Sequence, residues 1–398
     1  MTNLPQGWEV KKLEEIANIK GGKRLPKGEN LLDNNTKFAY IRVADFQDNG
    51  TINLQNIKFI NENTYNVLKN YKIYDDNLYI SIAGTIGKSG IIPKELNGAI
   101  LTENAVKLEY IQNNISNKFM YFFTLSNIFK TQIQTSTKIV AQPKLAITRL
   151  KQIQIPLPPL KEQERIVGIL DESFAKIDES IKILEQDLLN LDELMQSALQ
   201  KAFNPLKDNA KENYKLPQSW EWKSLEEISE NISAGGDKPK NCTESKTAKN
   251  QIPVYANGVN NNGLVGYTDK ATIIKPSLTI SARGTIGFVC IRKEPYFPIV
   301  RLISLIPCEN ILCLHYLYFC LNFFIAKGEG SSIPQLTIPK FKSLQIPLPP
   351  LKEQEQIAEH LDFVFEKAKA LKELYTKGLK DYEELKQSLL DKAFKGEL

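Results

Sequence analysis

The same sequence pattern occurs twice in this chain, and that repetition limits the folds available to it. The segment LPQGWEVKKLEEI at 4–16 returns as LPQSWEWKSLEEI at 216–228. IPLPPLKEQE at 155–164 returns unchanged at 346–355. The 398 residues therefore contain two copies of one unit. Each copy has a variable first part and a last part of fixed length.

A long helix is predicted after each Pro-rich motif, because proline suits the first helical position and acidic residues suit the first turn. Beyond Phe174, apolar residues recur at alternating spacings of three and four, a heptad pattern typical of helix pairs. Gly378 interrupts the second pattern and would let a partner backbone come close. We expect the two helices to pack on each other. The alternative is that each helix lies on its own globular domain.

The variable parts are predicted to be mixed α/β domains with short strands. The β-rich runs at 39–43, 78–82 and 277–281 are bounded by polar residues and glycine. The apolar run 311–326 is shorter than the roughly 20 residues of a membrane span, so we expect a buried helix. The polar segment 204–215 is the predicted linker.

Charge is distributed unevenly between these parts. Acidic residues outnumber basic ones by 10 to 5 in 161–203 and by 10 to 8 in 352–394, although the whole chain has a net charge of +5. The positive charge therefore lies on the globular parts. Such a distribution suits domains that touch a polyanion, while an ordinary solvated surface is the alternative.

Several loops carry residues suited to nucleic-acid contact. Four cations lie in KGGKRLPK at 20–27, which matches AGGDKPK at 234–240, and both are Gly/Pro-rich loops. GTIG occurs at 84–87 and 284–287, either as a tight turn or as a surface element beside Lys and Arg. The amides of NGVNNN at 257–262 either read adenine edges or form a plain turn.

The candidate DNA-binding residues are basic, amide and hydroxyl side chains on these loops and on other segments. They are Lys20, Lys23, Arg24, Lys27, Arg42, Thr85, Lys88, Lys138, Lys144, Lys238, Lys240, Asn257, Asn260, Arg283, Thr285, Arg301 and Gln335. No catalytic and no metal-binding residue is predicted.

Signatures of enzymes are missing from the sequence. Phosphate-binding, nucleophile-elbow and HExxH motifs do not occur, and the chain has only two histidines. Cys308, Cys313, His315 and Cys320 resemble a zinc cluster, but their apolar surroundings favour core cysteines. An odd number of cysteines and a start without a signal-peptide pattern predict a reducing, cytoplasmic location.

The doubled constellation of LPxxWExxxLEEI, GTIG and IPLPPLKEQE closely resembles the specificity subunit of type I DNA restriction–modification systems. The resemblance covers essentially the whole chain. It departs from the repeat at Phe288, which stands where the first copy has Lys88, so the role of that lysine does not carry over.

The resemblance implies an α+β fold with two target recognition domains separated by two long antiparallel coiled-coil helices, related by a pseudo-twofold internal repeat. The implied domain limits are 1–154 for the first recognition domain, 155–203 for the first spacer helix, 204–215 for the linker, 216–345 for the second recognition domain and 346–398 for the second spacer helix.

The family's activity implies a non-catalytic subunit that reads a bipartite, asymmetric site on double-stranded DNA. The implied partners are two adenine methyltransferase subunits and nuclease–translocase subunits, with no membrane. No cofactor is expected on this chain, because S-adenosylmethionine belongs to the methyltransferase. The alternative function is a coiled-coil scaffold that pairs two protein-binding modules without reading DNA.

Overall fold

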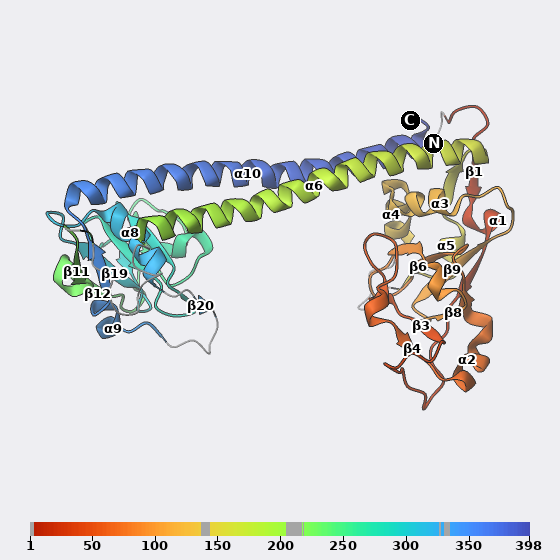
Figure 1. The fold of residues 1–398 in the computed structure, drawn as a ribbon, viewed down its shortest axis with the longest axis horizontal. Coiled ribbons are helices and arrows are strands. Elements are labelled where there is room, and N and C mark those ends of the chain that lie inside the picture. Colours follow the sequence, from red (N-terminus) through yellow and green to blue (C-terminus); the bar gives the residue numbers. More distant parts are fainter. Residues whose placement is uncertain (1–3, 137–143, 204–216, 218, 326–327, 330–334) are drawn as a thin grey trace. The chain divides into compact units, whose positions relative to one another are not determined.

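Figure 1 shows the fold of the chain in a computed structural model. The structure describes residues 4–136, 144–203, 217, 219–325, 328–329 and 335–398. Contacts divide the chain into two compact units: Met1–Leu184 with Lys377–Leu398, and Glu185–Thr376. Each unit holds one globular domain and part of both long helices. The predicted linker and the candidate Lys138 lie outside the described residues.

Two four-stranded sheets form the domain of the first unit. One is antiparallel throughout and contains, in spatial order, β2 (Ala17–Gly21), β9 (Ala105–Tyr110), β6 (Leu78–Ser81) and β7 (Ser89–Ile91). The other contains β4 (Lys58–Phe59), β3 (Ala39–Ile41), β8 (Ala99–Leu101) and β5 (Lys72–Ile73), with β3 and β8 parallel. Its helices are α1 (Leu13–Ile16), α2 (Glu62–Leu68), α3 (Asn117–Leu125), α4 (Asn127–Ser136) and α5 (Ile147–Lys151).

The domain of the second unit repeats this plan. Its four-stranded sheet contains β12 (Ser229–Ala234), β19 (Ile303–Pro307), β15 (Ser277–Ile280) and β17 (Val289–Arg292), again all antiparallel. A three-stranded sheet contains β14 (Leu264–Thr268), β13 (Ile252–Tyr255) and β18 (Phe297–Pro298), with β13 and β18 parallel. The remaining elements are α7 (Leu225–Ile228), β16 (Thr285–Ile286), α8 (Leu314–Phe324), β20 (Gly328–Glu329) and α9 (Ile338–Lys342).

The four-stranded sheets β2-β9-β6-β7 and β12-β19-β15-β17 have equivalent strand orders in the two domains, which confirms the internal repeat and the α+β class. The expected β-rich runs form β3, β6 and β15. The apolar run after 311 forms α8, which lies in the core of the second unit. No helix in the described ranges is long and apolar enough to cross a membrane.

A short antiparallel pair connects each domain to its long helix. β1 (Glu9–Lys12) pairs with β10 (Gln154–Leu157), and β11 (Glu221–Ser224) pairs with β21 (Gln345–Leu348) in the same register. These strands are the repeated motifs found in the sequence, so each motif pair closes one domain. The helices α6 (Leu160–Phe203) and α10 (Leu351–Lys395) follow β10 and β21 after two prolines.

The long helices pack on each other within each unit. In the first unit Asp178 of α6 pairs with Lys386 of α10, and an added Cβ at Gly378 would lie 3.1 Å from Leu184 Cδ1, so the two helices are antiparallel. In the second unit Asp192 of α6 pairs with Lys372 of α10. Residues of both helices also belong to the core of each domain. The helices therefore contact each other and the globular domains.

One buried glutamine fastens the first domain to α6. Gln163 is 1% exposed. Its Oε1 accepts a hydrogen bond from the Ser116 N–H at 2.8 Å, and its Nε2 donates to the carbonyls of Asn114 at 3.1 Å and Pro158 at 2.9 Å. The side chain thus joins the start of α3 to the start of α6, and its buried polar groups are satisfied.

An equivalent buried glutamine holds the second domain on α10. Gln354 is 0% exposed and accepts from the Cys313 N–H at 2.9 Å. It donates to the carbonyls of Ile311 at 2.9 Å and Pro349 at 2.8 Å. Because Gln163 and Gln354 are the glutamines of the two KEQE motifs, these motifs set how each domain is held on its own helix.

Candidate nucleic-acid interface

The Gly-rich loop of the first domain packs closely on a neighbouring turn. The Gly22 N–H donates to the Ala105 carbonyl at 3.0 Å, and the Lys23 N–H donates to the Leu101 carbonyl at 2.9 Å. A Cβ on Gly22 would lie 2.1 Å from the Thr102 oxygen, so this approach requires glycine. The loop that carries Lys20, Lys23, Arg24 and Lys27 is therefore fixed at its start against residues 101–105.

The first GTIG segment lies on the other side of this turn. The Ile82 N–H donates to the Asn104 carbonyl at 2.8 Å, and Gly84 and Gly87 have φ values of 76° and 88°. The Leu145 N–H donates to the Ile82 carbonyl at 2.8 Å, which brings Lys144 to the same place. We call residues 20–27, 83–88, 102–105 and 144 the first loop cluster.

Most cations at or beside the first loop cluster have an acidic partner. Lys20 pairs with Glu109 at 2.6 Å, Arg24 with Glu103 at 2.7 Å, and Lys88 with Asp48 at 2.7 Å. Arg42 follows β3 and is held by the buried carboxylate of Asp45, which accepts from its Nε at 3.0 Å and its Nη2 at 2.5 Å. A bound phosphate would compete with these carboxylates.

The ion pair between Arg24 and Glu103 illustrates this competition. Partial burial disfavours the charged form of Glu103, but hydrogen bonds from Arg24, its own backbone and Thr102 outweigh burial and lower the pKa of Glu103. The hydrogen bond to Glu103 in turn raises the pKa of Arg24, whose side chain is 80% exposed. Arg24 thus stays charged and accessible, with one face neutralised.

The second domain brings together the equivalent loops. The Gly235 N–H donates to the Leu302 carbonyl at 2.8 Å, and the Arg301 N–H donates to the Gly235 carbonyl at 2.9 Å. The Leu336 N–H donates to the Ala282 carbonyl at 3.1 Å, which places Gln335 beside the second GTIG segment. We call residues 234–240, 257–262, 281–287, 299–302 and 335 the second loop cluster.

The amide of Asn257 braces this cluster from inside. Its Oδ1 accepts from the Ala282 N–H at 2.8 Å, and its Nδ2 donates to the Val300 carbonyl at 2.6 Å. Asn260 is exposed, at the start of a turn in which Asn261 and Asn262 adopt left-handed φ values of 48° and 53°. Asparagine tolerates this conformation better than most residues, so the segment is a turn, and it exposes Asn260, Asn261 and Asn262.

Cations of the second loop cluster are less neutralised than those of the first. Lys238, Lys240, Arg283 and Arg301 are all exposed. Within the described ranges none of the four forms an ion pair. Thr85 is exposed in the first cluster, whereas the Thr285 hydroxyl is buried and has no hydrogen-bond partner among the described residues. The same backbone plan thus carries different side chains in the two domains.

Both halves of the chain match one known protein family. The sequence pattern of a family described as the type I restriction modification DNA specificity domain matches residues 5–188 and again residues 217–377. The chain belongs to this family. The two matches correspond to the two copies of the repeat.

Relatives agree with the family. A type I specificity subunit of Mycoplasma pneumoniae, S.MpnORF507P, is 29% identical over 357 residues, which are 88% of this chain and 87% of that protein. The EcoBI specificity subunit of Escherichia coli is 29% identical over 205 residues, which are 50% of this chain and 42% of that protein. A solved chain described under complex assembly and conformational transition of the type I R-M system has the same fold, with a TM-score of 0.82 and 21% identity over the whole of both chains. The protein is thus a type I specificity subunit, and the family implies recognition of a DNA sequence.

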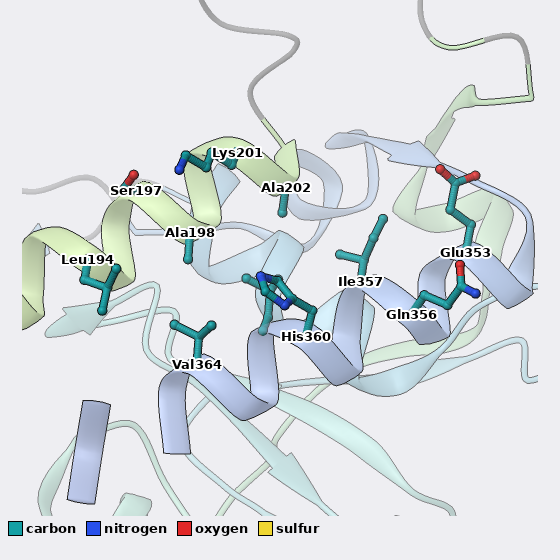
Figure 2. Close-up of a pocket in the computed structure, with 11 residues that line it drawn as sticks. Leu194, Ser197, Ala198, Lys201, Ala202, Glu353, Gln356, Ile357, His360 and Val364 are labelled. Carbon is teal, nitrogen blue, oxygen red and sulfur yellow. The ribbon is translucent and has the colours of Figure 1, made fainter. Parts of the chain in front are cut away.

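A groove lies between the two helices in the second unit of this specificity subunit. It has a volume of about 600 Å³ and is lined mainly by aliphatic side chains, among them Leu194, Ala198, Ile357 and Val364 (Figure 2). The His360 imidazole is drawn among them. The groove is formed by the end of α6 and the start of α10, so it belongs to the spacer helices and not to the loop clusters.

Sequence reasoning missed three residues that shape the specificity subunit. Gln163 and Gln354 belong to a repeated motif, but the sequence did not indicate that their side chains are buried. Arg292 is buried; it stacks 3.5 Å from the centre of the Tyr255 ring and donates to the Asn262 carbonyl at 2.5 Å, which supports the asparagine turn. No motif marks such an arginine, because its role depends on the pairing of β15 and β17.

Proposed function

We propose that this specificity subunit reads a bipartite, asymmetric site on double-stranded DNA, with one half read by each loop cluster. The observation that carries the proposal is the pair of clusters themselves. They have the same backbone plan but different side chains: Arg24 pairs with Glu103 in one cluster, whereas Arg283 and Arg301 in the other form no ion pair with the residues that the structure describes. Two domains that share a backbone arrangement but present different side chains to the DNA suit two half-sites of different sequence.

The proposal extends to the partner subunits. Two methyltransferase subunits would dock on the spacer helices and carry S-adenosylmethionine and the adenine pocket, and nuclease–translocase subunits would join for restriction. Support comes from large apolar side chains on the solvent faces of the helices: Ile183 is 56% exposed, Phe363 60% and Leu374 61%. A docked subunit would remove these side chains from water, which favours association.

The specificity subunit would contribute no catalysis of its own. His315 is one of the two histidines of the chain, and its Nδ1 lies 2.7 Å from Asp362 Oδ2, where it ties α8 to α10. The first domain has Lys118 and Asp171 at the matching place, also 2.7 Å apart. Because the matching residue of the first domain is a lysine, the contact is suited to holding two helices together. The five free cysteines fit the predicted cytoplasmic location.

Co-expression with a type I methyltransferase subunit tests the proposal. The complex should methylate adenines in two fixed half-sequences separated by a fixed spacer, and single-molecule or methylation-sensitive sequencing of the host DNA maps them. The methyltransferase alone is the control. Methylation without a bipartite pattern would contradict the proposal.

A salt titration of DNA binding separates it from the scaffold alternative. Neutralisation of phosphates by the loop clusters predicts a steep linear fall of log K with log salt concentration. A subunit that binds the methyltransferase but shows no salt-dependent DNA binding would be a protein scaffold.

A further inference from the structure

The turn between β18 and β19 is strained. Val300 and Arg301 are consecutive and have φ values of 52° and 59°, in the left-handed region. That region is unfavourable for side chains other than glycine and is rarest for β-branched residues such as valine. Such a conformation persists only where the surrounding structure enforces it.

Two neighbouring segments enforce this turn. The N–H groups of Val300 and Arg301 donate to the carbonyls of Gly236 at 2.8 Å and Gly235 at 2.9 Å. Asn257 Nδ2 donates to the Val300 carbonyl at 2.6 Å, while its Oδ1 is held by the Ala282 N–H. The turn is therefore fixed by the glycine loop on one side and by the asparagine loop on the other.

Packing does not explain why these two side chains occupy the turn. Val300 is 51% exposed and Arg301 is also exposed. The hydrogen bonds that hold the turn use the backbone groups of Val300 and Arg301, and glycine or asparagine would make them with less strain. What the strained residues add is a guanidinium and an apolar side chain, both carried by a backbone that is fixed in the second loop cluster.

The first domain lacks this device in the matching turn. There Glu103 and Asn104, which match Val300 and Arg301 by strand register, do not have left-handed φ values, and Glu103 presents a carboxylate to Arg24. A feature confined to one domain points to a role in what that domain reads, because the shared scaffold does without it in the other.

We propose that Arg301 reads a guanine of the second half-site by donating to its O6 and N7 in the major groove, and that Asn257 is the residue that positions it. The proposal rests on the proposed function. A fixed turn suits bidentate reading, which depends on direction, whereas a phosphate contact does not require it. The exposed Val300 beside the guanidinium suits a base edge, since apolar groups contact the methyl of thymine.

The test uses the methyltransferase complex with Arg301→Lys, which keeps the charge but removes the planar fork. Binding to a library of sites with each base pair varied in turn should lose its preference at one G·C pair of the second half-site by roughly 5- to 150-fold, the equivalent of about 1–3 kcal/mol. Preferences in the first half-site and the salt dependence should stay unchanged. Arg165→Lys makes the same chemical change at an exposed arginine of α6 outside both loop clusters; it is the matched control and should keep every base preference.

Asn257→Ala tests the positioning residue. It should weaken the preference at the same G·C pair as Arg301→Lys and at no pair of the first half-site. Arg301 is exposed, so its variant remains informative even if Asn257→Ala fails to fold. An unchanged preference at every pair in Arg301→Lys would overturn the proposal. In Arg301→Ala, uniform weakening with a salt slope reduced by about one would assign Arg301 to a phosphate and overturn it as well. A wild-type complex without sequence preference would instead refute the proposed function.

Discussion

Replacing the buried Gln354 by methionine should loosen the second domain from α10. The change keeps the length of the side chain and its helix propensity but removes three hydrogen bonds. The Cys313 N–H and the carbonyls of Ile311 and Pro349 then lose this partner. A buried group left unsatisfied costs about 1–3 kcal/mol, and carbonyls tolerate the loss better than N–H groups. We therefore expect a total near the lower limit, about 3 kcal/mol.

Hydrogen exchange measured by mass spectrometry is the appropriate assay, because the two units need not unfold together. Peptides that contain the Cys313 amide should exchange faster in Gln354→Met by a factor of roughly 100, the equivalent of about 3 kcal/mol. Gln356→Met is the matched control: it makes the same chemical change two residues away, at an exposed position, and should cost less than about 0.5 kcal/mol.

Equal exchange in Gln354→Met and Gln356→Met would refute the reasoning, since the hydrogen bonds of Gln354 would then not stabilise the attachment of the second domain to α10. A loss spread evenly over both units would also contradict it, because the hydrogen bonds of Gln354 are local to the second. Gln163→Met should produce the same effect at the Ser116 amide of the first unit.

Four other changes test the interface and the spacer. Glu103→Gln should strengthen DNA binding, because Arg24 then loses a competing carboxylate. Arg24→Ala should weaken it, because the carboxylate of Glu103 then faces the phosphates without a neutralising partner. Gel shifts at several salt concentrations measure both effects. Exchange of residues 216–345 for those of a relative should alter one half of the methylated site only. One heptad inserted after Leu184 and another after Lys377 keeps the seam in phase and adds about 10.5 Å of helix. Mapped half-sites should keep their bases and move one to three base pairs apart.

The repeat, the long helices and the central strands followed from the sequence because each depends on a local pattern. Heptad spacing predicted α6 and α10, and buried strands such as β6 are continuous apolar runs. The KEQE motif was recognised as a helix start, but its buried member is the glutamine. Which side of the helix start becomes buried is decided by the domain that packs on it, and no local pattern carries that information.

The sequence identified the basic glycine loops as candidates for DNA contact, and this stays a prediction. That these loops lie next to the GTIG turns could not be read from the sequence, because it depends on how the strands pair. The partner of Arg24 lies 79 residues away, and it is set by the pairing of β2 with β9. The strained turn at Val300 and Arg301 has no sequence signal at all, because a left-handed valine contradicts the local preference and is held by distant hydrogen bonds.

Gly378 was expected to admit a partner backbone, but its nearest neighbour is a side chain. A Cβ added there would lie 3.1 Å from Leu184 Cδ1, the tip of a half-buried leucine. Alanine stabilises a helix interior by about 1 kcal/mol relative to glycine. A shift of Leu184 Cδ1 by a few tenths of an ångström relieves the contact.

We therefore expect Gly378→Ala to stabilise the first unit by about 0.5–1 kcal/mol, measured by thermal unfolding. In Leu184→Ala the contact is absent, and adding Gly378→Ala should give the full increment of about 1 kcal/mol. If Gly378→Ala instead destabilises the chain, and does so only when Leu184 is present, the glycine is required for the close approach of the two helices and the gain in helix propensity is the smaller effect.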